Sequence, residues 1–107
     1  MTPEARLLKA TIVYAKQRGC LTIRLSLRPG VATGWPDLLV LCPGGRVLFM
    51  EIKALGGHPT QLQLHRLEQL RELGYAATWC DSFDAARDAI ASALDSNAVH
   101  AAGRPPP

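Results

Sequence analysis

Long hydrophobic runs are missing from this sequence. The longest apolar stretches, Leu38 to Cys42 and Val47 to Met50, have the length of single strands, whereas a membrane-spanning helix needs roughly 20 apolar residues. Near the N-terminus, charges at Glu4, Arg6 and Lys9 interrupt any apolar stretch that could act as a secretory signal. We therefore expect a soluble protein that stays in the cytoplasm, without a membrane partner.

Cysteine and histidine are scarce as well. The three cysteines are widely separated and include no CxxC pair; they are Cys20, Cys42 and Cys80. This odd number and spacing argue against a disulfide framework and a structural zinc site, so we expect all three to be small buried hydrophobes. The three histidines lack the HExxH spacing of catalytic zinc sites; they are His58, His65 and His100.

The remaining composition is that of a globular domain. The chain has 107 residues, of which 48% are hydrophobic and 20% charged. This length allows one small domain with a single core and excludes two independent ones. The net charge of +3 and the pI near 9.0 permit an anionic partner but are too common to identify one.

Hydrophobic periodicity and turn residues divide the chain into seven elements. The expected helices run from Pro3 to Gln17, from Thr60 to Leu73, and onward from a cap at Asp81-Ser82. The expected strands are Leu21 to Leu27, Asp37 to Cys42, Arg46 to Lys53 and Tyr75 to Cys80. In the first strand, Leu21, Ile23, Leu25 and Leu27 would form the buried face. The order α-β-β-β-α-β-α predicts an α/β fold, a mixed sheet flanked by helices.

The hairpin around Pro43-Gly44-Gly45 carries the strongest chemical signal. If these residues form a three-residue loop with Gly45 left-handed, Cys42 pairs with Arg46 and Asp37 faces Glu51. Opposed side chains on antiparallel strands share one face, with Cβ atoms about 5 Å apart. Lys53, two residues after Glu51, lies on that face as well. A four-residue loop would shift the register and turn Asp37 away.

Two carboxylates this close repel each other unless a cation lies between them. They provide hard oxygen ligands suited to Mg²⁺ or Mn²⁺, and a neighbouring lysine can stabilise charge on a phosphoryl group. An isolated E-x-K is more often an exposed polar strand end. The opposed Asp37 favours instead a metal-dependent phosphodiesterase site.

These residues resemble a known family. Gly34-Trp35-Pro36-Asp37, Glu51-Ile52-Lys53, Thr60 and Gln63 are similar, in order and spacing, to the virus-type replication-repair nuclease domain, VRR-NUC, of the PD-(D/E)xK nuclease superfamily. The resemblance extends from Glu4 to about Leu94. It implies a restriction-endonuclease-like fold, with residues 1–95 as the nuclease domain. The small residues beyond Asp95 and the stretch from Gly103 to Pro107 predict that residues 96–107 form a flexible tail.

The resemblance also implies residue roles and a substrate. Asp37, Glu51 and the backbone carbonyl of Ile52 would bind Mg²⁺ or Mn²⁺, and Lys53 would be the catalytic lysine. Glu4 would complete the metal site from the first helix, and Gln63 would support it as a catalytic residue from the second. The expected activity is that of a metal-dependent endonuclease on DNA, branched or duplex, and particularly on four-way junctions, with the chain acting as a homodimer.

Helical phase supports the two outlying residues without assigning their roles. Glu4 precedes Leu8 by four residues, beside the core-facing stripe, but a first-turn acid can also simply favour the helix dipole. Gln63 precedes Leu67 by four, and could equally be a capping or core glutamine. Five basic residues could contact phosphates, none singled out by the sequence: Lys9, Arg24, Arg28, His58 and His65.

Two other functions remain open from the sequence. A nucleic-acid-binding module could keep this fold without cutting, although the complete set of Asp37, Glu51 and Lys53 argues against a decayed site. A protein-interaction domain would leave the paired carboxylates without a cation. For a homodimer, the candidate surfaces are the first helix and the loop with Val31 and Trp35, although Trp35 could also cover the core or stack on a base.

Overall fold

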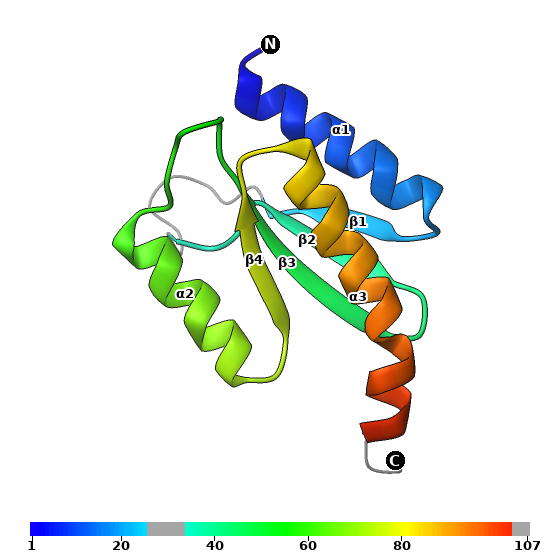
Figure 1. The fold of residues 1–107 in the computed structure, drawn as a ribbon. Coiled ribbons are helices and arrows are strands. Elements are labelled where there is room, and N and C mark those ends of the chain that lie inside the picture. The colour runs from blue at the N-terminus through cyan, green and yellow to red at the C-terminus, as the bar shows by residue number, and fades with distance from the viewer. Residues whose placement is uncertain (26–33, 104–107) are drawn as a thin grey trace.

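The chain folds into a four-stranded sheet with helices on both faces (Figure 1). The computed structural model describes the backbone of residues 1–25 and 34–103, and the side chains of residues 1–25 and 34–95. In chain order, the elements are α1 (Pro3–Gln17), β1 (Leu21–Arg24), β2 (Leu38–Cys42), β3 (Arg46–Ile52), α2 (Gln61–Glu72), β4 (Ala76–Cys80) and α3 (Phe83–Gly103). The order α-β-β-β-α-β-α and the mixed sheet are therefore confirmed.

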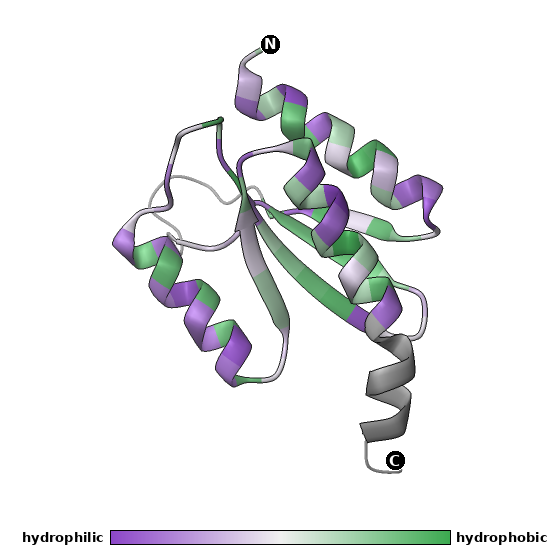
Figure 2. Cartoon of the chain, in the orientation of Figure 1, coloured by the Kyte–Doolittle hydropathy of each residue, from purple (hydrophilic) through white to green (hydrophobic). Residues whose placement is uncertain are grey.

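The sheet has the strand order β1-β2-β3-β4. The β1–β2 and β2–β3 pairs are antiparallel, whereas β4 lies parallel to β3 after the crossover through α2. Figure 2 shows the central strands as the most hydrophobic part of the chain, and hydrophilic and hydrophobic residues alternating along the helices. None of the helices in the described residues is both long and apolar enough to cross a membrane.

The period-2 alternation of β2 and β3 divides the core into two clusters. On one face, Leu38, Val40 and Met50 pack against side chains of α1 and α3, such as Ala15 and Ile90. On the other face, a smaller cluster joins the second helix to β3 and β4, and it consists of Leu67, Leu70 and Ala77 with Trp35, Phe49 and Trp79 around them. The result is three layers, α1 and α3, the sheet, and α2.

Capping residues mark the start of each helix at the position that the sequence predicts. The Thr2 hydroxyl accepts a hydrogen bond from the Ala5 amide at 3.1 Å, with Pro3 in the first turn. Ser82 accepts one from the amide of Ala85 at 3.2 Å. In α2, Thr60 is the N-cap of a complete capping box, and such caps are typically worth about 1 kcal/mol.

The β2–β3 hairpin has the register that the three-residue loop requires. Cys42 pairs with Arg46, and Leu38 pairs with Met50. Both Gly44 and Gly45 have positive φ, 85° and 81°, so the loop uses the left-handed region twice, where only one such residue was expected.

The expected burial of the first strand is wrong. Leu21 is 71% exposed and Ile23 is 47% exposed, because β1 is an edge strand and α2 covers the β3–β4 part of that face. The opposite side of β1, on the face that α1 and α3 cover, carries the more polar Thr22 and Arg24. These two residues pair with the buried Val40 and Leu38. The strand ends at Arg24, and the expected continuation through Leu27 lies outside the described residues.

The last helix continues beyond the expected start of the tail. Its backbone is helical to Gly103, eight residues past Asp95. The segment contains several alanines, which have the highest helix propensity, so the loss of apolar residues after Leu94 did not mark the end of the helix.

Candidate active site

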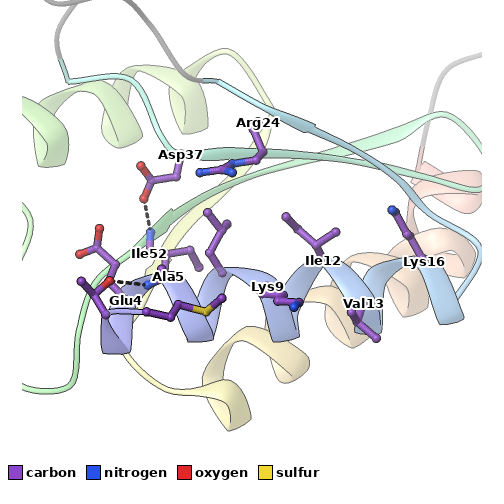
Figure 3. A pocket seen from close by; sticks show the side chains of 12 residues that line it. Glu4, Ala5, Lys9, Ile12, Val13, Lys16, Arg24, Asp37 and Ile52 are labelled. Carbon is purple, nitrogen blue, oxygen red and sulfur yellow. Dashed lines mark hydrogen bonds between the residues drawn. The ribbon is translucent and has the colours of Figure 1, made fainter.

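Two carboxylates meet where β2 begins and β3 ends. Asp37 immediately precedes β2, and because Leu38 pairs with Met50, continuing the register places Asp37 opposite Glu51. The backbone amide of Ile52 donates a hydrogen bond of 2.9 Å to Asp37 Oδ2, shown as a dashed line in Figure 3. This bond fixes the Asp37 carboxylate against the end of β3.

Glu51 is the buried member of the pair, with only 2% of its surface exposed. Its Oε2 atom accepts a hydrogen bond of 3.0 Å from Gln63 Nε2 and lies 3.3 Å from Lys53 Nζ. Its Oε1 atom is also buried but has no hydrogen-bond donor within the described residues. A buried carboxylate oxygen without a partner is costly, so this atom calls for a proton or a cation.

The electrostatic environment of Glu51 favours its neutral form. Burial, and then repulsion by the Asp37 carboxylate, raise the pKa of Glu51 from its ordinary value of 4.5 to about 7, while the Lys53 ammonium opposes the rise. Two adjacent carboxylates cannot both ionise easily in a poorly solvated place. A single lysine therefore does not compensate two ionised carboxylates, and the excess negative charge that both would carry disfavours the ionised form of Glu51.

Gln63 connects this site to the start of α2. Its Oε1 atom accepts a hydrogen bond of 2.8 Å from the Thr60 amide, and its backbone amide donates one of 3.1 Å to the Thr60 hydroxyl. The opposite end of the same amide, Nε2, is the group that donates to Glu51. The two interpretations left open by the sequence, a helix cap and a residue that contacts the site, therefore both hold.

Glu4 lies beside the site without closing around it. It is exposed in the first turn of α1 and lines the same groove as Asp37 and Ile52 (Figure 3). Within the described part of the chain, no group of three or more His, Cys, Asp or Glu side chains is close enough together to hold a metal ion. The structure thus brings Asp37, Glu51, Lys53 and Gln63 together, and the role of Glu4 as a ligand stays a prediction.

The chemistry of this donor set suits a divalent cation with hard-ligand preference. Such ions are held by one or two carboxylates together with water and substrate oxygens. Asp37 and Glu51 supply the two carboxylates, and the orphaned Oε1 of Glu51 is an acceptor with no other use among the described residues. The neighbouring side chains therefore fit Mg²⁺ or Mn²⁺.

Aromatic residues near the site pack against other side chains of the protein. Trp35 packs 6.5 Å from Phe49, with the Arg66 guanidinium 4.9 Å from the centre of its ring. Trp35 therefore packs on the protein's own core, which is one of the alternatives left open by the sequence. On the other side, the ring of His58 lies 5.6 Å from that of Trp79, which pairs with Glu51 across β3 and β4.

One functional candidate escaped the sequence analysis. Lys16 lines the groove that also contains Asp37, and Lys9 and Arg24 line the same groove. Lys9 and Lys16 are seven residues apart, the spacing of two helical turns, and this is the signal that could have paired them. Two other residues with expected roles, Arg28 and Val31, lie outside the described residues.

Comparisons with known proteins identify relatives of this chain. No family model matches the chain. A solved "VRR_NUC domain" structure is 30% identical to it, with a TM-score of 0.76 over 85% of this chain and 97% of that one. A second structure, titled "VRR_NUC domain protein", is 21% identical, with a TM-score of 0.69 over 89% and 90% of the two chains, and supports the fold.

A curated relative comes from a phage. "Putative nuclease p44" of Acyrthosiphon pisum secondary endosymbiont phage 1 is 43% identical over 51 residues, which are 48% of this chain. The match spans about half of that relative, 55% of its length.

Proposed function

Because this chain belongs to the VRR-NUC family, we propose that it is a metal-dependent DNA endonuclease, acting in the cytoplasm on branched DNA such as four-way junctions. The observation that carries the proposal is the meeting of Asp37 and Glu51, with a buried Glu51 oxygen that has no donor in the described residues. Such a pair is stable as a divalent cation site and is difficult to explain as a structural feature.

In this proposal, Asp37 and Glu51 hold Mg²⁺ or Mn²⁺, with the carbonyl of Ile52 and the carboxylate of Glu4 as further ligands. The chemistry supplied by the ion is activation of water for attack and neutralisation of charge on the phosphoryl group. Hydrolysis adds water to phosphorus, breaks one P–O bond and returns a proton to the leaving oxygen.

The protein's own residues then have distinct tasks. Lys53, with its ammonium 3.3 Å from Glu51 and largely buried, orients the attacking water or stabilises the developing negative charge. Gln63 holds the Oε2 atom of Glu51, and the Ile52 amide holds Asp37. These hydrogen bonds fix both carboxylates before substrate arrives, which preorganises the site.

The proposed homodimer follows from the substrate. A four-way junction must be cut symmetrically in two strands, and one chain has one site, so a two-fold pair would supply both. Leu21 and Ile23 are exposed on the uncovered face of β1 and offer apolar surface for such an interface. The surface of α1, expected from the sequence, is a second candidate.

One experiment separates this function from its alternatives. Linear duplex, flap and four-way junction DNA are incubated with the protein in Mn²⁺ or in EDTA, beside the Asp37→Asn variant. We expect cutting of the junction in Mn²⁺ by the wild type alone. Binding without any cutting would identify a nucleic-acid-binding module instead, and neither binding nor cutting would favour a protein-interaction domain.

A further inference from the structure

A groove of about 510 Å³ leads away from the carboxylates along α1. Its walls come from α1 and from the ends of β1 and β3, and Figure 3 shows the side chains that face it. The charged residues around it are Glu4, Lys9, Lys16, Arg24 and Asp37.

Charge is ordered along this groove. The acids, Glu4 and Asp37, lie at the end next to the proposed metal site, whereas Lys9 and Lys16 follow along α1 (Figure 3). Arg24, the last residue of β1, lines the groove across from α1, and its side chain lies toward the Asp37 end in the view of Figure 3. In the part of the chain that the structure describes, none of these three cations takes part in an ion pair, in contrast to Arg71 and Arg87, which have acidic neighbours.

The length of this basic segment indicates a polymer rather than a single small anion. Lys9 and Lys16 are separated by seven residues, about 10 Å along the helix axis at 1.5 Å per residue. A DNA strand advances about 3.4 Å per phosphate along its axis, so the two lysines can reach phosphates roughly three nucleotides apart. Lysine and arginine are common contacts to the phosphates of a nucleic-acid backbone.

The floor between the cations is apolar. Leu8 and Ile12 are half-buried there, and Val13 is 47% exposed. An aliphatic floor bordered by cations suits a sugar-phosphate strand, because deoxyribose and base edges can lie against the apolar side chains while phosphates reach the ammonium groups.

We propose that this groove binds the backbone of the DNA strand on one side of the scissile phosphate, through Lys9, Lys16 and Arg24. The inference rests on the proposed nuclease function, because the acidic end of the groove defines where cutting occurs. From Glu4 to Lys16 the helix extends about 18 Å, or roughly five nucleotides. Cleavage therefore requires a flank of about this length on one side only, and the groove sets which side.

The first test measures binding to a fluorescein-labelled four-way junction by anisotropy in EDTA, over a range of salt concentrations. Lys16→Ala and Arg24→Ala should each weaken binding roughly three- to tenfold and lower the salt slope by about 0.9, because each removes one phosphate contact. Arg87→Ala is the matched control: it removes the same charge from an exposed position on α3 and should change affinity less than twofold.

Circular dichroism checks that each variant is folded, and an intact junction on a gel checks that EDTA stops cleavage. The groove assignment is overturned if Lys16→Ala and Arg24→Ala bind the junction like the wild type, or if Arg87→Ala weakens binding equally. In that case, cutting by the wild type would still support the nuclease function. If the variants lose binding but the wild type never cuts, the groove stands and the nuclease function fails.

A second test shortens the substrate. With nicked junctions whose strands are truncated from either side of the mapped cut, the initial rate should fall at least tenfold when one flank is reduced below roughly five nucleotides. Shortening the opposite flank by the same amount should have little effect. Equal sensitivity on both sides would contradict a one-sided groove.

Discussion

The Glu51→Gln variant should separate the stability that the buried Glu51 carboxylate costs the protein from the function of that carboxylate. In the wild type, the pKa of Glu51 is raised from 4.5 to about 7 by burial and by Asp37. The folded state therefore holds a proton that the unfolded state releases between these pH values. The stability gained from that proton is fully present below about pH 4.5 and is lost as the pH rises through about 7.

The magnitude follows from the two pKa values. At 1.36 kcal/mol per pH unit, a rise from 4.5 to about 7 corresponds to about 3 kcal/mol lost at high pH. Glutamine is neutral at every pH and keeps an oxygen for Gln63, so it avoids this loss. We therefore expect Glu51→Gln to be more stable than the wild type at pH 8 without metal, by up to about 3 kcal/mol, and similar to it at pH 4.5.

Thermal unfolding in EDTA at both pH values measures this difference, which for a domain of this size corresponds to about 4–8 °C per kcal/mol. The control is Glu68→Gln, which neutralises an exposed glutamate on α2 and should change stability by less than about 0.5 kcal/mol. Adding Mn²⁺ should raise the melting temperature of the wild type and not that of Glu51→Gln. A Glu51→Gln protein that is no more stable at pH 8 would refute the reasoning.

Four further outcomes are expected. Asp37→Asn and Lys53→Ala should abolish cleavage of a four-way junction while leaving the circular dichroism spectrum and DNA affinity nearly unchanged; near wild-type cutting by either would remove it from the mechanism. Gln63→Ala should lower the free energy of unfolding by about 1 kcal/mol through loss of the capping box, which denaturant unfolding measures. The same change should also lower the initial rate of cleavage, because Glu51 loses its hydrogen bond from Gln63. Deleting residues 96–107, the proposed tail, should hardly change the melting temperature, because the composition of this segment offers little apolar surface to bury; a fall of many degrees would show that the tail docks. Light scattering at micromolar concentration should give a mass near twice 11.6 kDa, and a monomer that cuts both strands of a junction in one encounter would contradict the dimer.

The elements that the sequence predicted well are those set by local interactions. Thr2 and Thr60 cap the first two helices through hydrogen bonds to residues three positions ahead. The loop at Gly44 and Gly45 fixes the hairpin register, and with it the meeting of Asp37 and Glu51. Here the meeting of the two carboxylates could be anticipated because they are only 14 residues apart and joined by one turn.

What escaped prediction depends on packing between distant elements. The alternation of Leu21 and Ile23 indicated a strand, but the face that a helix covers is decided by where α2 crosses the sheet. Helical phase placed Gln63 on an inward face, yet its contact with Glu51 depends on how α2 docks against β3 and β4. The groove likewise required α1 to lie beside β1, which brings Arg24 into the same groove as Lys9 and Lys16.

The amide of Gln63 has a consequence for motion. Because its oxygen is bonded to the Thr60 amide and its nitrogen to Glu51, fraying of the first turn of α2 would release the carboxylate at the same moment. Local opening of that turn and loosening of the site are therefore one event. A cation that orders Glu51 should slow hydrogen exchange at the amides of Gln63 and Leu64, which are bonded to Thr60 and far from any ligand atom in sequence.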